Sequence, residues 1–397
     1  VWLTEVGVDK STIGLFASVA IPYSLKFLWA PFMDSLNVPV LTKYLGRRSS
    51  WIVVSQLLLM LSIVLLGSAD PTIDPIKTAI AALIVAFCSA SQDIVVDAYR
   101  VELLPKEMQG TGAAMHVFGY RVGMLLSSAG ALYLAEYYSW FTVYTIIAIF
   151  VVAGLVAVLI TGEPDINKST LSLYEKAQKT REQREMRHYW LKHTLIDPFT
   201  DFMKRNHWLA ILIFIILYKL GDALAGVMTN TFLVEIGFSK TEIATIVKTY
   251  GFVATILGSF IGGALVYKYG VLNILWIGGI LQMLSNLMFA VQSYIGYDTD
   301  ILAITIAVEN LTGGIGSAAF VAYISGLCSV SFTASQYALL SSLAAVGRTV
   351  FASFSGYMAE HWGWVEFFVL TTGAAIPGLL VLWYLTWRSA PWERQAQ

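Results

Sequence analysis

The chain has 397 residues, of which 57% are hydrophobic and 13% are charged, and its mean hydropathy is +0.68. Soluble domains carry roughly a quarter charged residues, so this composition predicts an all-α membrane protein. The net charge of −1 and the lack of a basic, aromatic-rich pattern exclude nucleic acid as a partner. The sequence contains neither a phosphate-binding loop nor a His/Cys cluster with metal-ligand spacing. We therefore expect no enzyme, no cofactor and no metal.

Apolar runs recur along the whole chain. A helix needs about 20 such residues to cross a bilayer. Eleven runs of that length are expected to span, at 11–33, 50–68, 76–99, 110–135, 141–161, 207–232, 240–267, 273–294, 300–326, 335–357 and 365–386. The first ten residues, VWLTEVGVDK, are too short to span. We interpret them as the tail of a spanning helix whose beginning is missing, which predicts twelve spans.

Lys and Arg residues are distributed unevenly between the two sides that alternating spans define. Of the 25, 17 fall on one side, three fall on the other and five lie within spans. Cytoplasmic loops are enriched in Lys and Arg. The loop with Arg47 and Arg48, the polar segment 162–206 and the C-terminus are therefore predicted to be cytoplasmic.

The polar segment 162–206 divides the twelve expected spans into two equal blocks. We expect four parts: an N-terminal half at 1–161, a cytoplasmic middle loop at 162–206, a C-terminal half at 207–387 and a cytoplasmic tail at 388–397. A faint internal repeat supports this division. GYRVGMLLSSAGALYLAEYYSWF (119–141) and VGRTVFASFSGYMAEHWGWVEFF (346–368) share a central Arg, a Gly-Ser-rich continuation and an AE. The layout resembles the major facilitator fold, two six-helix halves related as repeats, with the first helix largely missing here.

Ionisable side chains within the expected spans are costly in hydrocarbon and are candidates for function. Lys26 can face the central cavity and hold an anion, with Tyr23 among its aromatic neighbours, or it can pair with a carboxylate for packing. Arg121 and Arg348 lie near mid-membrane on equivalent helices. Their planar guanidinium groups suit a carboxylate or phosphate. Alternatively, an acidic neighbour neutralises each of them, such as Asp93 for Arg121.

The acidic members of this set suggest both structural and proton-carrying roles. Lys219 and Asp222 are three residues apart and can pair along one helix face, which is as compatible with structure as with function. Glu309, beside Asn310, has no basic residue within reach on its own helix. It is therefore either protonated or paired across helices, and it is a candidate proton carrier.

Two sequence stretches predict a cytoplasmic gate. DSLNVPVLTKYLGRRSS resembles the loop motif G-x-x-x-D-R-x-G-R-R of major facilitators, in which the acid and the basic residues close the gate. The matching residues are Asp34, Arg47 and Arg48, although the spacing is expanded and Ser35 replaces the first Arg. In SASQDIVVDAYRVELL, Asp97 and Arg100 are expected to join this gate. Asp93 lies about 6 Å deeper at 1.5 Å per residue and is a second candidate for proton coupling.

Several blocks in order resemble the AmpG-type muropeptide permeases: WLTEVGVDKSTIGLF, LKFLWAPFMD, LGRRSSW, SASQDIVVDAYRVELL and GYRVGML. The resemblance implies proton-driven import of anhydro-muropeptides across the bacterial inner membrane, in cell-wall recycling that bears on β-lactam resistance. It implies a monomer in the lipid bilayer with a muropeptide and protons as partners. The substrate site would comprise Tyr23, Lys26, Tyr120, Arg121, Lys219, Asp222, Asn310 and Arg348, and Asp93 or Glu309 would carry the proton.

Two other functions remain open. The first is a permease for another anionic metabolite, such as a CoA ester, because related proteins carry different anions. The second is a non-transporting membrane scaffold, which the missing first helix would favour. Charged residues inside the spans, such as Arg121 and Glu309, argue against a scaffold because a protein without a cavity has little use for them.

Overall fold

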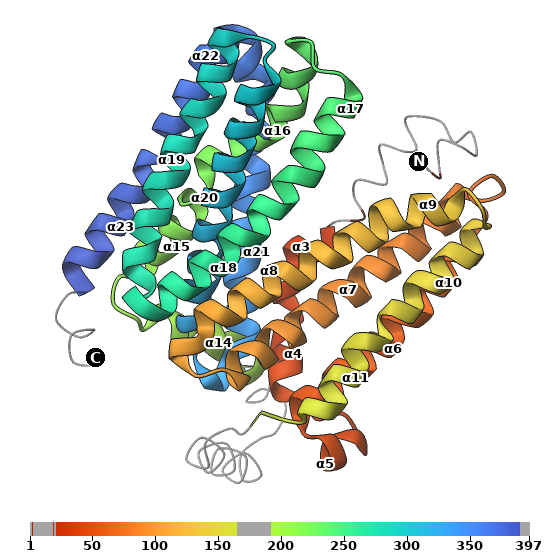
Figure 1. Ribbon diagram of the computed structural model, residues 1–397. Helices are drawn as coiled ribbons and strands as arrows, with labels where there is room; N and C mark the ends of the chain where they lie inside the picture. The colour runs from red at the N-terminus through yellow and green to blue at the C-terminus, as the bar shows by residue number, and fades with distance from the viewer. Residues whose placement is uncertain (1, 3–18, 20, 165–191, 390–397) are drawn as a thin grey trace. The chain divides into compact units, whose positions relative to one another are not determined.

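The computed structural model describes residues 2, 19, 21–164 and 192–389, which form helices joined by turns and loops, with no strand among them (Figure 1). They form two compact units. Unit 1 consists of Val1–Leu103, Val122–Phe202 and Cys328–Ser342. Unit 2 consists of Leu104–Arg121, Met203–Leu327 and Leu343–Gln397. The described residues do not include 1, 3–18 and 20, which belong to the expected end of the first helix and to the start of the span at 11–33. They also do not include 165–191 of the middle loop or most of the expected tail at 388–397.

Unit 1 is built around two long antiparallel helices. They are α6 (Arg47–Ser68) and α7 (Pro75–Leu103), which pack on each other, and α6 also packs on α10 (Trp140–Phe150). Its shorter elements are α3 (Ile21–Leu25), α4 (Ala30–Ser35), α5 (Leu41–Leu45), α9 (Ala131–Ala135), α11 (Val152–Thr161) and α14 (Asp197–Met203).

The helix that carries Lys26 is interrupted. A 3-10 turn at Lys26–Leu28 separates α3 from α4, and Pro31 stands in the first turn of α4. Proline has no backbone N–H and clashes with the preceding turn, so one continuous α-helix cannot run through this position. At this break the ammonium group of Lys26 lies beside α7, where it contacts Asp93.

Unit 2 consists of a helical bundle. Its members are α15 (Trp208–Leu217), α16 (Leu220–Glu235), α17 (Lys240–Glu242), α18 (Gly251–Tyr269), α19 (Val271–Ile295), α20 (Thr299–Gly326), α22 (Ser355–Ala374) and α23 (Ile376–Ser389). A π-helical segment at Ile243–Tyr250 leads into α18. Helices α18 and α20 approach closely because Gly258 and Gly314 have no side chain at the contact. Small residues are the usual means of close helix packing in membranes.

Two helices are shared between the units. The chain passes from unit 2 to unit 1 within α8 (Gln109–Leu125), after Arg121, and from unit 1 to unit 2 within α21 (Thr333–Ala352), after Ser342. These are the fifth and eleventh expected spans, which carry the internal repeat.

Nine helical segments of the described residues are long and apolar enough to cross a membrane. They match nine of the expected spans, except that one of them, Ser355–Trp387, joins the end of the eleventh to the twelfth. Within it, Gly363 has a φ of +74° and breaks α22 between these two spans. Glycine adopts this backbone conformation without the steric cost that other residues carry.

Candidate functional site

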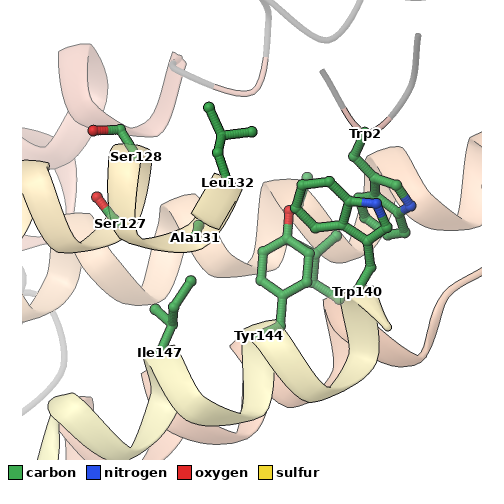
Figure 2. A pocket seen from close by; sticks show the side chains of 10 residues that line it. Trp2, Ser127, Ser128, Ala131, Leu132, Trp140, Tyr144 and Ile147 are labelled. Carbon is green, nitrogen blue, oxygen red and sulfur yellow. The ribbon is translucent and has the colours of Figure 1, made fainter. Parts of the chain in front are cut away.

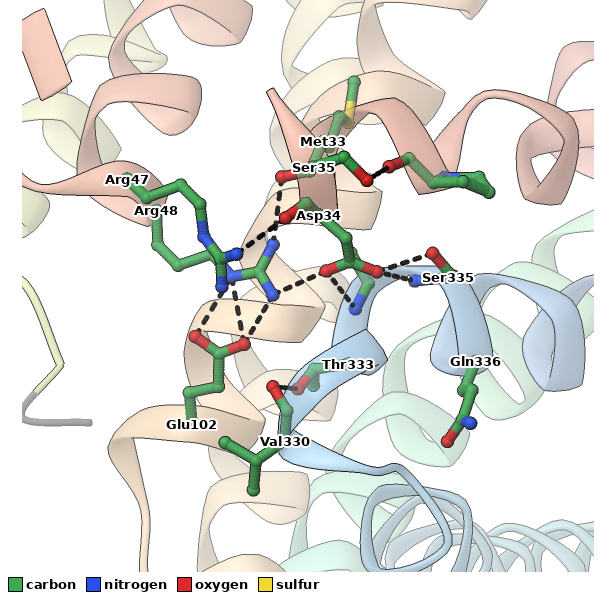
Figure 3. Close-up of polar contacts among 12 residues, drawn as sticks. Met33, Asp34, Ser35, Arg47, Arg48, Glu102, Val330, Thr333, Ser335 and Gln336 are labelled. Carbon is green, nitrogen blue, oxygen red and sulfur yellow. Dashed lines mark hydrogen bonds and ion pairs between the residues drawn. The ribbon is translucent and has the colours of Figure 1, made fainter. Parts of the chain in front are cut away.

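Arg48 is the centre of a buried polar network in unit 1 (Figure 3). Its Nη2 donates to Asp34 Oδ1 at 2.7 Å and to Glu102 Oε1 at 2.5 Å, and its Nε lies 3.0 Å from both oxygens of Glu102. The Arg48 side chain is 0% exposed, and those of Asp34 and Glu102 are 2% and 1% exposed. A buried charge is tolerated only when it is paired and hydrogen-bonded, and two carboxylates satisfy this guanidinium.

Asp34 also binds the beginning of α21. Its Oδ2 accepts from the backbone N–H of Ser335 at 2.8 Å and from the Ser335 hydroxyl at 2.5 Å, and its Oδ1 accepts from Ala334 N at 3.2 Å. A carboxylate at a helix N-terminus satisfies free N–H groups and interacts favourably with the helix dipole. One carboxylate therefore joins Arg48 to a helix that lies 300 residues further along the chain.

Arg47 and Glu163 complete the surroundings of this network. Arg47 Nη1 donates to the backbone oxygen of Asp34 at 2.6 Å. Glu163 accepts from the backbone N–H groups of Arg48 and Ser49, at 2.9 and 2.8 Å, and so caps α6. Gly46, with φ of +83°, leaves the space that the Glu163 side chain occupies. Sequence reasoning missed Glu163, although an acid directly after a span in GEPD is a signal for such a cap.

Arg100 contacts α21 at Tyr337, and Asp97 lies beside Arg100. Arg100 Nη2 lies 3.6 Å from Asp97 Oδ1 and donates to the Tyr337 hydroxyl at 3.1 Å, and its guanidinium lies 5.5 Å from the centre of the Tyr337 ring. Gln336, the neighbour of Tyr337 on α21, is hydrogen-bonded to Asp201 of α14 at 2.9 Å. All five residues predicted for the gate thus lie around the segment 328–342 or around Asp34, which binds it.

Lys26 and Asp93 form an ion pair in unit 1. The Lys26 ammonium lies 2.6 Å from Asp93 Oδ2, and the Lys26 side chain is 6% exposed against 39% for Asp93. Tyr23 is hydrogen-bonded to Ser89 at 2.5 Å, and Trp29 Nε1 donates to Ser91 Oγ at 3.0 Å. The interrupted helix is therefore fastened to α7 by polar contacts. In this structure Asp93 is paired with Lys26, and Arg121, the other cation considered for it, belongs to unit 2.

Lys219 and Asp222 lie where the seventh expected span is interrupted. Helix α15 ends at Leu217, and Lys219 has non-helical φ and ψ of −102° and 13° before α16 begins. The Lys219 ammonium lies 3.5 Å from Asp222 Oδ2, as the three-residue spacing predicts, and it donates to Ser317 Oγ at 3.1 Å. Interrupted helices at mid-membrane are typical of substrate and ion sites in transporters.

Glu309 lies near this pair. Its Oε2 accepts from Asn310 Nδ2 at 2.8 Å, and Asn310 Oδ1 accepts from the Thr255 hydroxyl at 2.8 Å. The Glu309 carboxyl is close enough to Asp222, Lys219 and Arg121 to interact with each of them electrostatically. Within the described residues it forms no ion pair.

The two predicted arginines both belong to unit 2, where each interacts with a different charged residue. Arg121 interacts electrostatically with Glu309, and Arg348 with Lys219. Arg121 is half-buried and Arg348 is exposed. Tyr120 is 65% exposed. We call Arg121, Lys219, Asp222, Glu309 and Arg348 the unit 2 charge cluster.

An apolar pocket of about 380 Å³ lies in unit 1 (Figure 2). It is lined by Trp2, Leu66, Ala82, Ser127, Ser128, Ala131, Leu132, Trp140, Tyr144 and Ile147. None of the predicted site residues line it. Among the described residues no group of three or more His, Cys, Asp or Glu side chains is placed to hold a metal ion.

Comparisons with known proteins agree with this architecture. The Major Facilitator Superfamily model matches residues 1–220 and 208–396. The anhydromuropeptide permease of Escherichia coli K12 is 39% identical over 383 residues, which are 96% of this chain and 74% of that protein.

Solved structures share the fold at low sequence identity. The Major Facilitator Superfamily transporter FucP, in the outward conformation, is 12% identical with a TM-score of 0.71, covering 96% of this chain and 91% of FucP. The human organic anion transporter TETRAN is 13% identical with a TM-score of 0.70, covering 96% of this chain and 87% of TETRAN. The chain is a multi-pass membrane protein of the Major Facilitator Superfamily and belongs to the family of the anhydromuropeptide permease.

Proposed function

We propose that this protein imports anhydromuropeptides across the bacterial inner membrane by proton symport, with its C-terminus in the cytoplasm. The observation that supports this best is the unit 2 charge cluster, which brings three cations and two carboxylates together within expected membrane spans. The name of the E. coli relative, 39% identical to this chain, supports the choice of substrate.

The cations of the cluster suit the substrate's carboxylates. Arg121 and Arg348 carry permanent charges and planar donors, which match a carboxylate in a bidentate manner. Lys219 has three N–H donors, and the contacts with Asp222 and Ser317 use two of them. Asn310 and the exposed ring of Tyr120 would contact polar and sugar faces of the substrate. Within unit 1, Lys26 and Tyr23 are separate candidates for contact with an anionic or sugar group.

Two carboxylates are candidates for carrying the proton. Glu309 has a hydrogen bond from Asn310 but no ion pair within the described residues, so the protonated form costs no broken salt bridge. Asp93 is paired with Lys26 and is 39% exposed, so water can reach it, but protonation would leave Lys26 without its partner. A proton carrier must exist in both its protonated and its ionised form during each transport cycle. Because protonation breaks no ion pair of Glu309, we favour Glu309 over Asp93 as the carrier.

The network around Arg48 would act as the cytoplasmic gate. The carboxylate of Asp34 holds the start of α21 through three hydrogen bonds. The segment 328–342 cannot move away from Asp34 unless these bonds break. We propose that the gate comprises Asp34, Arg47, Arg48, Asp97 and Arg100, with Glu102 and Glu163 as further members.

The test is uptake of radiolabelled GlcNAc-anhydroMurNAc-peptide into bacterial cells that lack their own permease and express this chain. Uptake should exceed that of cells with the empty vector and should fall to that level when a protonophore is added. Glu309→Gln keeps the size of the side chain but cannot ionise, so it should lose coupled uptake while binding is retained. The exposed Glu360→Gln is the matched control.

Two results would contradict the proposal in different ways. No uptake by a chain shown to be inserted in the membrane would remove muropeptide as the substrate. Uptake that is unchanged by the protonophore would remove proton coupling. Uptake of a labelled CoA ester, without uptake of the muropeptide, would instead favour a permease for another anion.

A further inference from the structure

Gln282 is a buried polar residue next to the unit 2 charge cluster. It lies on α19 and is 4% exposed, and its Nε2 donates to Asp222 Oδ2. Its Oε1 is buried without a hydrogen-bond partner in the described part of the chain. An unsatisfied buried amide oxygen costs free energy, so packing or function has to hold the side chain in this orientation.

Glycines on α20 create the space for this side chain. A methyl group added at Gly316 would collide with Gln282 Oε1 and would lie 2.8 Å from Gln282 Cδ. The three nearest atoms to such a methyl group all belong to Gln282. A methyl group at Gly313 would lie 3.7 Å from Gln282 Nε2. The helix face at 313–316 therefore forms a slot that aims the amide at Asp222.

The contact matters because Asp222 sits at the break in the seventh span. Its Oδ2 receives both the Gln282 amide and the more distant ammonium of Lys219, at 3.5 Å. Gln282 Nε2 and the Lys219 ammonium thus share one carboxylate oxygen of Asp222, and Gln282 Nε2 is the nearer of the two donors. Lys219 also donates to Ser317 of α20. The contacts with Asp222 and Ser317 use two of its three N–H donors, and the third remains for an anion.

We propose that Gln282 is a positioning residue of the transport site. Its amide holds the Asp222 carboxylate so that Lys219 does not close onto it and remains available to an anionic group of the substrate. The missing side chain at Gly316 leaves the amide its space. The inference rests on the transport function proposed above. It adds to the proposed site a neutral residue that is not a member of the unit 2 charge cluster.

The first test is the concentration dependence of muropeptide uptake by Gln282→Leu. Without the amide, Asp222 can move onto Lys219 and form a closer ion pair. The half-saturating substrate concentration should rise about tenfold, the equivalent of one hydrogen bond to a charged group, while the maximal rate falls less. Gln56→Leu is the matched control, because Gln56 is also a buried glutamine of a spanning helix, on α6 of unit 1. Equal effects of the two variants would overturn the proposal.

The isosteric Gln282→Glu variant provides a rescue. A protonated Glu donates a hydrogen bond to Asp222, whereas an ionised Glu repels it. Relative to wild type at the same pH, this variant should approach normal half-saturation in acid and lose affinity at neutral pH. The other titratable groups that interact with Asp222 are Lys219, Glu309 and Tyr218, and they are the same in wild type and variant. A purely structural role for Gln282 predicts no such dependence on pH.

Gly316→Ala tests the slot itself. Alone, it should displace the amide and raise the half-saturating concentration as Gln282→Leu does. In a Gln282→Ala background it should add less than about twofold, because the atoms that it strikes are absent. Gly373→Ala, at a helical glycine with open space around it, is the control. Full additivity of Gly316→Ala and Gln282→Ala would overturn the proposal.

A measurement without substrate separates this inference from the transport function. In the purified protein, the thermal unfolding midpoints of Gln282→Leu, Asp222→Leu and the double variant form a cycle. The proposal predicts that the two effects are not additive, because each substitution removes the same contact. Additive effects would overturn the positioning contact even if uptake is observed. Non-additive effects without any uptake would retain the contact and overturn only the transported substrate.

Discussion

The contact between Asp34 and α21 is the most direct test of the Arg48 network. The carboxylate of Asp34 accepts four hydrogen bonds, from Arg48 Nη2, Ala334 N, Ser335 N and the Ser335 hydroxyl. Asp34→Asn keeps the shape of the side chain but has only one acceptor oxygen. At least two of the four donors therefore lose their acceptor.

The size of the effect follows from the burial of these donors. An unsatisfied buried donor costs about 1–3 kcal/mol, so two cost about 2–6 kcal/mol. The lower end applies because the Ser335 hydroxyl can turn and accept from the new amide. A free-energy change of about 1.4 kcal/mol changes an equilibrium constant tenfold. A loss of about 2 kcal/mol therefore raises the equilibrium constant for opening of the segment 328–342 by about 30-fold. Ser335→Ala removes only one donor and should have a smaller effect.

The assay uses Cys328, which lies at the start of this segment and is half-buried. The rate of its reaction with a maleimide, read by mass spectrometry on purified protein, reports opening of the segment. Asp34→Asn should raise this rate by about 30-fold, and Ser335→Ala by less. Asp70→Asn, at an exposed position in the loop between α6 and α7, is the matched control. An unchanged rate in a monodisperse Asp34→Asn sample would refute the reasoning.

Three further predictions concern other parts of the molecule. Arg121→Ala should abolish muropeptide uptake while membrane abundance stays normal, and retained uptake would show that this arginine only supports packing. Lys26→Met should lower the free energy of unfolding by about 1 kcal/mol, because it leaves Asp93 without its partner; adding Asp93→Asn should restore the unfolding midpoint, and a further fall would contradict the pairing. The hydrogen bond from Tyr297, followed by those from Ser239, lowers the pKa of Glu242 below its ordinary value. The stabilisation that these bonds provide is therefore present above the ordinary pKa of a glutamate and is lost as the pH falls through the lowered pKa. Tyr297→Phe should therefore lower the unfolding midpoint at neutral pH, and the difference from wild type should shrink in acid; a constant difference would argue against this.

The sequence alone was sufficient for the fold class and for the positions of most spans. Hydropathy is a local property, and a helix in lipid must satisfy its backbone within one continuous segment, so each span is visible in one dimension. The ion pair of Lys219 with Asp222 was predictable for the same reason, because residues three apart on a helix are neighbours. Family membership was predictable from blocks such as LGRRSSW, and the comparisons confirm it.

Only the tertiary structure decided which distant charges meet. Asp93 is paired with Lys26, 67 residues away, whereas the sequence had suggested Arg121 as its partner. Glu102 and Glu163 are drawn into the surroundings of Arg48, and Gln282 reaches Asp222 through a glycine slot. Composition and spacing do not encode such contacts, because they depend on helix crossings, on interruptions at residues such as Lys26 and Lys219, and on which side chains leave room.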